Sequence, residues 1–120
     1  RLANAGHEPP LIHARNGTFT EVPARSPPLG ILPLEAGEAG ITDEIFNLDG
    51  GALYIFTDGV TEGDLADGSR LEVEGFQKII TERQHLPASE RIETVVSVLR
   101  DTGRTRHDDI TLVAVELPNA

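Results

Sequence analysis

The 120-residue sequence contains no cysteine, methionine or tryptophan, and only one tyrosine. The absence of cysteine excludes disulfides and any reaction through a thiolate, and it leaves oxygen and imidazole groups to hold a metal ion. Basic residues are also scarce, with ten against twenty acidic ones, and the formal net charge is −10. Because phosphate backbones repel such a chain, we expect no nucleic-acid binding.

No apolar run approaches the roughly 20 residues needed to cross a bilayer, so we predict a soluble protein without membrane insertion. Residues 1–6 have neither the basic region nor the long apolar region of a signal peptide. Since the chain opens with Arg1 and contains no methionine, we expect it to be part of a longer protein. Its length and 38% hydrophobic content fit one small domain over residues 1–120.

Turn signals separate several short segments with strand character. The pair Asn16-Gly17 lies between residues 10–14 and 19–22, and it predicts an antiparallel hairpin with a type I′ turn. Residues 23–40 contain four prolines and three glycines, which predicts a long loop. Alternation over 41–48, the turn at Asp49-Gly50-Gly51 and the apolar run 52–56 predict a second hairpin, with 52–56 as a central strand.

The second half of the sequence predicts two amphipathic helices and a closing strand. Apolar residues recur at helical spacing over 72–83 and 87–100, and the second helix is expected to begin near Ala88 or Ser89. Residues 108–117 predict a buried strand with two carboxylates at its start. The order of strands, loop, strands, two helices and strand predicts an α+β fold, with helices packed on a mainly antiparallel sheet.

Three polar clusters each adjoin a predicted strand: Asn4-Ala5-Gly6-His7, Thr57-Asp58-Gly59 and His107-Asp108-Asp109. Each cluster alone also fits an ordinary turn. Together the clusters indicate a cation site. Two acidic strand ends in one small sheet can converge, and converging carboxylates repel each other unless a cation neutralises them. The residues therefore predict a divalent-cation site, with Mg²⁺ or Mn²⁺ favoured over structural zinc.

These clusters carry a family resemblance. The segments NAGHEPPL (4–11), PLGI (28–31), LYIFTDGVTE (53–62) and DDITLV (108–113) follow one another in the order typical of SpoIIE-like phosphatases. That family is the stage II sporulation protein E-like branch of the metal-dependent (PPM, or type 2C) protein serine/threonine phosphatases. The resemblance runs from residue 1 to about residue 117, and the segment TDGVTE is its most specific part.

The resemblance implies part of a PPM-type αββα sandwich, in which helices flank two β-sheets and two metal ions lie at one end. By motif position it implies that Asp58 and Asp108 bind metal and that Gly59 lets the backbone turn beside it. Asp109 and His7 receive supporting roles. The implied reaction is hydrolysis of phosphoserine or phosphothreonine by a water that Mn²⁺ or Mg²⁺ activates, without a catalytic side chain as nucleophile.

Family members also carry a Gly-Asp-rich segment and a Gly-His-Gly-type segment upstream, and these supply further metal ligands. The sequence begins after both, so we expect residues 1–120 to be the C-terminal part of a phosphatase domain that is inactive by itself. The strands that carry those segments are then also expected to be missing. An unpaired sheet edge would favour pairing between two copies, so a homodimer is expected.

The resemblance further implies that the parent protein is a cytoplasmic bacterial phosphatase in a stress or sigma-factor pathway. Its expected substrate and partner is a phosphorylated anti-sigma-factor antagonist. A second hypothesis is a non-catalytic regulatory or interaction module with an incomplete metal site, and the upstream coding sequence distinguishes the two. A third is an unrelated β-rich metal-binding module.

Overall fold

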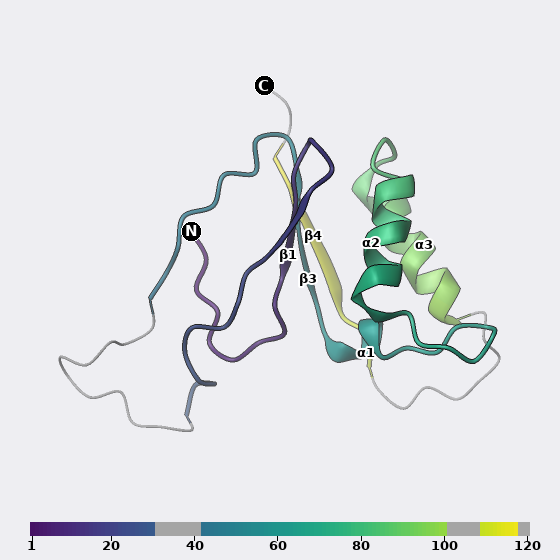
Figure 1. Ribbon diagram of the computed structural model, residues 1–120, viewed down its shortest axis with the longest axis horizontal. Helices are drawn as coiled ribbons and strands as arrows, with labels where there is room; N and C mark the ends of the chain where they lie inside the picture. Colours follow the sequence, from purple (N-terminus) through teal and green to yellow (C-terminus); the bar gives the residue numbers. More distant parts are fainter. Residues whose placement is uncertain (31–41, 101–108, 118–120) are drawn as a thin grey trace.

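A computed structural model describes residues 1–30, 42–100 and 109–117. The elements are β1 (Leu11–His13), β2 (Phe19–Glu21), β3 (Ala52–Phe56), α1 (Asp58–Thr61), α2 (Glu72–Glu82), α3 (Ala88–Arg100) and β4 (Leu112–Glu116). The four strands form one antiparallel sheet in the order β2-β1-β3-β4, and helices α2 and α3 lie together beside it (Figure 1). This arrangement confirms the α+β class.

The first predicted hairpin is confirmed, with a different turn. Leu11 pairs with Glu21 and His13 with Phe19, and the Gly17 N–H donates to the Ala14 carbonyl at 2.9 Å. Gly17 has a φ of 92°, but no positive φ occurs at the preceding asparagine, so the turn is not type I′. A connection of more than two residues needs only one left-handed residue, which glycine supplies.

The second predicted hairpin is wrong over the described residues 42–48. Glu44 forms an isolated antiparallel bridge with Leu2, and each N–H donates to the other's carbonyl at 2.8 Å. The segment cannot pair with β3, because β1 occupies one edge of that strand and β4 the other. The tight turn itself does form: Asp49 and Gly50 have positive φ, and the Gly51 N–H donates to the Leu48 carbonyl at 2.6 Å.

β3 is the central strand of the described sheet, as predicted. Alternate side chains of β3 are buried in the hydrophobic core, namely Ala52, Tyr54 and Phe56. Phe76 on α2 contacts two of them, with ring centroids 5.5 Å from Tyr54 and 5.1 Å from Phe56. Ile80 on α2 and Val95 on α3 are fully buried in the same core. The apolar stripes of both helices therefore pack on this face of the sheet, as their spacing predicted.

β4 was predicted to be a buried strand, but in the described sheet it is an edge strand. Val113 is 44% exposed and Val115 is 40% exposed. Their pairing partners on β3 are Ile55 and Leu53, and both are half-buried. The second face of the sheet is therefore apolar and partly open within the described residues. The second sheet of the expected sandwich remains a prediction.

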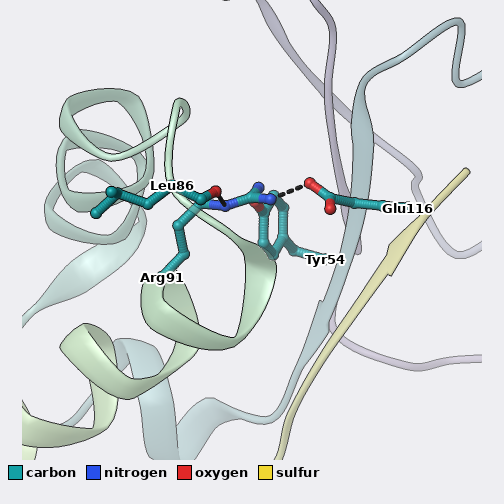
Figure 2. Close-up of polar contacts among 4 residues, drawn as sticks. All are labelled: Tyr54, Leu86, Arg91 and Glu116. Carbon is teal, nitrogen blue, oxygen red and sulfur yellow. Dashed lines mark hydrogen bonds and ion pairs between the residues drawn. The ribbon is translucent and has the colours of Figure 1, made fainter. Parts of the chain in front are cut away.

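A buried arginine joins α3 to two strands (Figure 2). The Arg91 Nε–H donates to the Leu86 carbonyl at 3.1 Å, and the guanidinium also donates to the Tyr54 hydroxyl and to the Glu116 carboxylate. The Arg91 side chain is only 4% exposed. The helix is thus fixed to β3 and β4 by directional bonds as well as by apolar packing. Among the described residues, no helix has the length and apolar character needed to span a bilayer.

Candidate functional site

Thr57 joins the end of β3 to the segment before β4. The last ladder pair of these two strands is Phe56 with Leu112. One residue further, the Thr57 N–H donates to the Thr111 carbonyl at 3.1 Å, and the Thr111 N–H donates to the Thr57 hydroxyl at 3.2 Å. The pairing between the two segments therefore continues to the residue directly before Asp58.

The hydroxyl of Thr57 takes the place of its backbone carbonyl in this last pair. In a regular hydrogen-bonded antiparallel pair, the Thr111 N–H would donate to the Thr57 carbonyl. That carbonyl instead accepts the Val60 N–H at 3.0 Å, in the first turn of α1. Thr57 is the N-cap residue of α1, yet its side chain does not cap the helix. The chain can therefore leave β3 for a helix while the sheet keeps its last hydrogen-bonded pair.

Asp58 is the first residue of α1 and is exposed. Its carboxylate makes no hydrogen bond or ion pair with any other described residue. The turn that carries it is anchored, because Val60 is fully buried in the core and Thr61 is 8% exposed. A fixed backbone with an open carboxylate is a suitable donor for a hard divalent cation.

The structure brings the acidic segment before β4 to the same end of the sheet as Asp58 (Figure 1). Asp109 is exposed, and its backbone carbonyl accepts the Thr57 hydroxyl at 3.5 Å. Asp108, the second predicted metal ligand, lies outside the described residues and immediately precedes Asp109 in the chain. The convergence of the two acidic strand ends is therefore seen at the level of the backbone, at Thr57, Asp109 and Thr111.

His7 precedes β1, and because β1 runs antiparallel to β3, the start of β1 lies at the same end of the sheet as the end of β3. His7 is exposed, and its Nδ1 is 2.7 Å from the Glu8 carbonyl oxygen. No described contact joins His7 to Asp58, and its supporting role remains a prediction.

The loop around His7 is organised by Asn4, which is buried. Its side-chain NH₂ donates to the Val22 carbonyl at 3.1 Å, and its Oδ1 accepts the His7 N–H at 2.8 Å. Gly6 has a φ of 77°, and a Cβ at this position would overlap the ring of Pro28. Two segments of the family pattern, 4–11 and 28–31, are therefore in direct contact at Gly6 and Pro28.

The donor chemistry at this end of the sheet fits a hard cation, although the described residues form only part of a site. The side chain of Asp58 offers oxygen donors, the type that Mg²⁺ and Mn²⁺ prefer. Within residues 1–30, 42–100 and 109–117, no group of three His, Cys, Asp or Glu side chains could hold a metal ion. Gly59 is buried within α1 and has no positive φ, and its predicted place beside a metal stays a prediction.

This arrangement, with helices beside an antiparallel sheet and acidic strand ends at one end, is the one expected for part of a PPM-type phosphatase domain. The model of the family described as stage II sporulation protein E (SpoIIE) matches residues 1–118. The chain therefore belongs to the SpoIIE family, which is related to protein phosphatases. Searches of curated proteins and of solved structures gave no significant match.

Sequence reasoning included Thr57 in a polar cluster but assigned it no role of its own. Its hydroxyl forms hydrogen bonds with both neighbours of Ile110, namely Asp109 and Thr111. A threonine after an apolar strand and before a helix suggests a helix cap, and this threonine has another use. The sequence gives no sign of that use, because Thr111 is distant along the chain.

Proposed function

We propose that the full-length protein containing this sequence is a metal-dependent phosphatase that hydrolyses phosphoserine or phosphothreonine in a protein. The observation that carries the proposal is the pairing of Thr57, the residue directly before Asp58, with Thr111, the residue directly before β4. Membership of the SpoIIE family supports it. Acidic residues adjoin both the end of β3 and the start of β4, which agrees with the metal-dependent chemistry proposed from the family.

In this proposal Asp58 and Asp108 hold Mn²⁺ or Mg²⁺ through their carboxylate oxygens. When bound, such ions supply an activated water and neutralise charge on the phosphoryl oxygens. The chain's own contribution is to fix the carboxylates: Val60 anchors the turn that carries Asp58, and Thr57 ties that turn to the neighbouring segment. Asp109, His7 and Gly59 keep the supporting roles inferred for them.

The negative net charge of the chain supports a requirement for bound metal ions when a phosphorylated substrate approaches. A chain with a formal net charge of −10 repels a phosphorylated substrate over long distances. Cations held by Asp58 and Asp108 reverse the local sign of the charge where the phosphate must approach. We propose a phosphorylated anti-sigma-factor antagonist as the substrate, in the cytoplasm of a bacterium, in keeping with the sporulation context of the family.

The test is a phosphatase assay of the full-length protein with Mn²⁺ and a phosphoserine or phosphothreonine peptide. We expect Asp58→Asn to lose most of the Mn²⁺-dependent turnover. Asp49→Asn is the matched control, because Asp49 lies in the turn at the other end of β3 and asparagine tolerates its φ of 40°. Unchanged turnover in Asp58→Asn would reject the proposed site.

A non-catalytic regulatory or interaction module is the second candidate. The observation that favours it is the lack of a three-ligand group among the described residues. Its signature would be a wild-type full-length protein without Mn²⁺-dependent phosphatase activity, together with Mn²⁺ binding that is equal in wild type and Asp58→Asn. Homodimerisation through the edge strand β2 or β4 remains a proposal, and strictly monomeric light scattering across a concentration series would contradict it.

A further inference from the structure

We propose that a cavity between the sheet and the α2–α3 connection binds a small planar nitrogen heterocycle of the nucleobase type, stacked on the imidazole of His13. The cavity has a volume of about 220 Å³, and it lies by the start of β3, at the end of the sheet away from Asp58. All of the residues that line it belong to the described part of the chain. The inference is therefore independent of the proposed metal site.

The register of the sheet explains why a cavity forms here. Ala52 on β3 pairs with His13 on one side and with Glu116 on the other, and directly paired residues of antiparallel strands lie on the same face of a sheet. This is the face that α2 and α3 cover, because Arg91 of α3 donates to the Glu116 carboxylate. The middle position of the row carries only a methyl group. Space is therefore left above Ala52, between two larger side chains.

One face of the His13 ring is already stacked on another ring. Phe19 on β2 lies against it, with ring centroids 4.2 Å apart and an angle of 8° between the ring planes. Because β1 lies between β2 and β3, the opposite face of the imidazole is turned toward Ala52 and the cavity. The His13 side chain is buried, so this face is a fixed, flat wall on which a second ring can stack.

His13 also has a buried polar atom that is not satisfied by the protein. Its Nε2 has no hydrogen-bond partner among the described residues. Buried polar atoms without a partner are rare, and water or a bound molecule commonly completes the structure around them. The unpartnered nitrogen in the wall of the cavity therefore agrees with an occupant there.

The dimensions of the cavity select a single flat ring system. Neighbouring strands lie roughly 4.8 Å apart, so the backbones that carry His13 and Glu116 are separated by roughly 10 Å. A flat ring needs about 3.5–4.0 Å on each of its faces, so one ring fits between the two side chains and two rings do not. Drug-sized ligands occupy pockets of about 300–1,000 Å³, and this cavity suits a smaller molecule.

The polar groups of the cavity favour a nitrogen heterocycle over a hydrocarbon ring. Gln84, which follows α2, lines the cavity with a carboxamide that both donates and accepts, and such a group pairs with the donor–acceptor edge of adenine. Glu116 accepts the Arg91 hydrogen bond through one oxygen, and its second oxygen can accept an N–H from the ligand. The net charge of −10 disfavours a phosphate on the ligand, so a free base or nucleoside is favoured over a nucleotide.

The experiment measures adenine binding to the full-length protein by equilibrium dialysis and follows the ring protons of His13 by NMR. The His13 signals are identified by their absence from His13→Gln. Ala52→Val fills the cavity floor with two methyl groups, and Gln84→Ala removes the carboxamide. Gln77→Ala on α2 is the matched control, because Gln77 does not line the cavity. Cyclohexylamine serves as a non-planar probe.

We expect saturable adenine binding with a dissociation constant of about 1 mM or below, together with upfield shifts of the His13 ring protons, which stacking causes. Ala52→Val should raise the dissociation constant by about tenfold or more, without loss of stability, because filling a cavity commonly stabilises a protein. Gln84→Ala should raise it by about fivefold or more, and Gln77→Ala should leave it unchanged. Cyclohexylamine should not shift the His13 signals.

Two results would overturn the proposal directly: no saturable binding by wild type up to about 10 mM adenine, or equal affinity in wild type and a folded Ala52→Val, since adenine would then bind elsewhere. If Ala52→Val does not fold, the other two measurements decide. An unchanged dissociation constant in Gln84→Ala, or binding without an upfield shift of the His13 ring protons, rejects the stacked site. Cyclohexylamine binding as tight as that of adenine would likewise show that ring stacking is not its basis.

Discussion

Arg91 on α3 donates a hydrogen bond to the hydroxyl of Tyr54, a fully buried side chain on β3. The same guanidinium reaches the Glu116 carboxylate on β4, whose side chain is 40% exposed (Figure 2). Burial raises the pKa of Tyr54, and the nearby Arg91 charge opposes part of that rise. The phenol therefore stays neutral in the physiological range and serves as a hydrogen-bonding partner for the arginine.

The first prediction concerns this buried charge. Arg91→Met should lower the free energy of unfolding by about 3 kcal/mol, because it leaves the Tyr54 hydroxyl without its partner and Glu116 without its counterion. Urea unfolding at pH 7 measures the loss. Arg100→Met, at the exposed end of α3, is the control and should change stability by no more than about 0.5 kcal/mol. A loss below about 1 kcal/mol for Arg91→Met would show that the network contributes little.

The second prediction is a pH dependence that arises at His13. This side chain is 4% exposed, is stacked on Phe19 with ring centroids 4.2 Å apart, and its buried Nε2 has no hydrogen-bond partner among the described residues. It lines a cavity of about 220 Å³ at the end of the sheet away from Asp58, together with His85 and Glu116. Burial and the Arg91 charge lower the pKa of His13, while a hydrogen bond with the Gly17 backbone opposes this.

Because the pKa of His13 is lower in the folded state, the unfolded chain binds more protons at mildly acidic pH. The free energy of unfolding should therefore fall as the pH drops below about 6.5, the pKa of an unperturbed histidine, toward the lower folded value. Urea midpoints between pH 7.5 and 5 test this. His13→Gln should flatten the profile below pH 6.5, while the exposed His85→Gln should keep the wild-type slope. An unaltered slope in His13→Gln would assign the effect to other groups.

The third prediction compares two glycines in turns. A Cβ on Gly51 would overlap the His13 carbonyl oxygen, a backbone atom that cannot move aside cheaply, whereas a Cβ on Gly17 would meet nothing within 4 Å. Gly51→Ala should therefore cost about 2–3 kcal/mol through overpacking, and Gly17→Ala only about 1 kcal/mol through its positive φ. Thermal or urea unfolding ranks the two, and the reverse order would contradict the packing at Gly51.

The fourth prediction uses one substitution at two levels of burial. Ile80 is fully buried in the core and Ile45 is 76% exposed. Ile80→Val should lower the free energy of unfolding by about 1 kcal/mol, because it removes one buried methylene group, and Ile45→Val should change it by less than about 0.3 kcal/mol. Equal effects in urea unfolding would mean that α2 does not pack on the sheet as described.

Local patterns predicted the elements whose structure depends on near neighbours. The Asn16-Gly17 turn gave the first hairpin, and apolar spacing gave α2 and α3 with boundaries close to those observed. Features that depend on distant partners were not predictable in the same way. Residues 42–48 have the alternation of a strand, but nothing local indicates that both edges of β3 are already occupied.

Two residues of the structure show the same limit at the level of side chains. Arg91 lies on the buried face of α3, where sequence patterns do not predict a charged side chain. Its burial is possible because the guanidinium donates hydrogen bonds to Tyr54 and Glu116, which lie on strands distant in the sequence. Thr57 was predicted only as part of a polar cluster, and its hydrogen bond with Thr111 is evident only in the tertiary structure. The sequence predicted Asp58 as a metal ligand, and that role stays a prediction, whereas the hydrogen bonds of Thr57 beside it emerged only from the tertiary arrangement.

The contact between Gly6 and Pro28 has an evolutionary consequence. Any side chain at position 6 meets the proline ring and also a backbone angle that only glycine adopts easily. Making room at position 28 would relieve only the overlap and would leave the backbone strain. In an alignment of relatives, position 6 should therefore stay glycine even where position 28 varies.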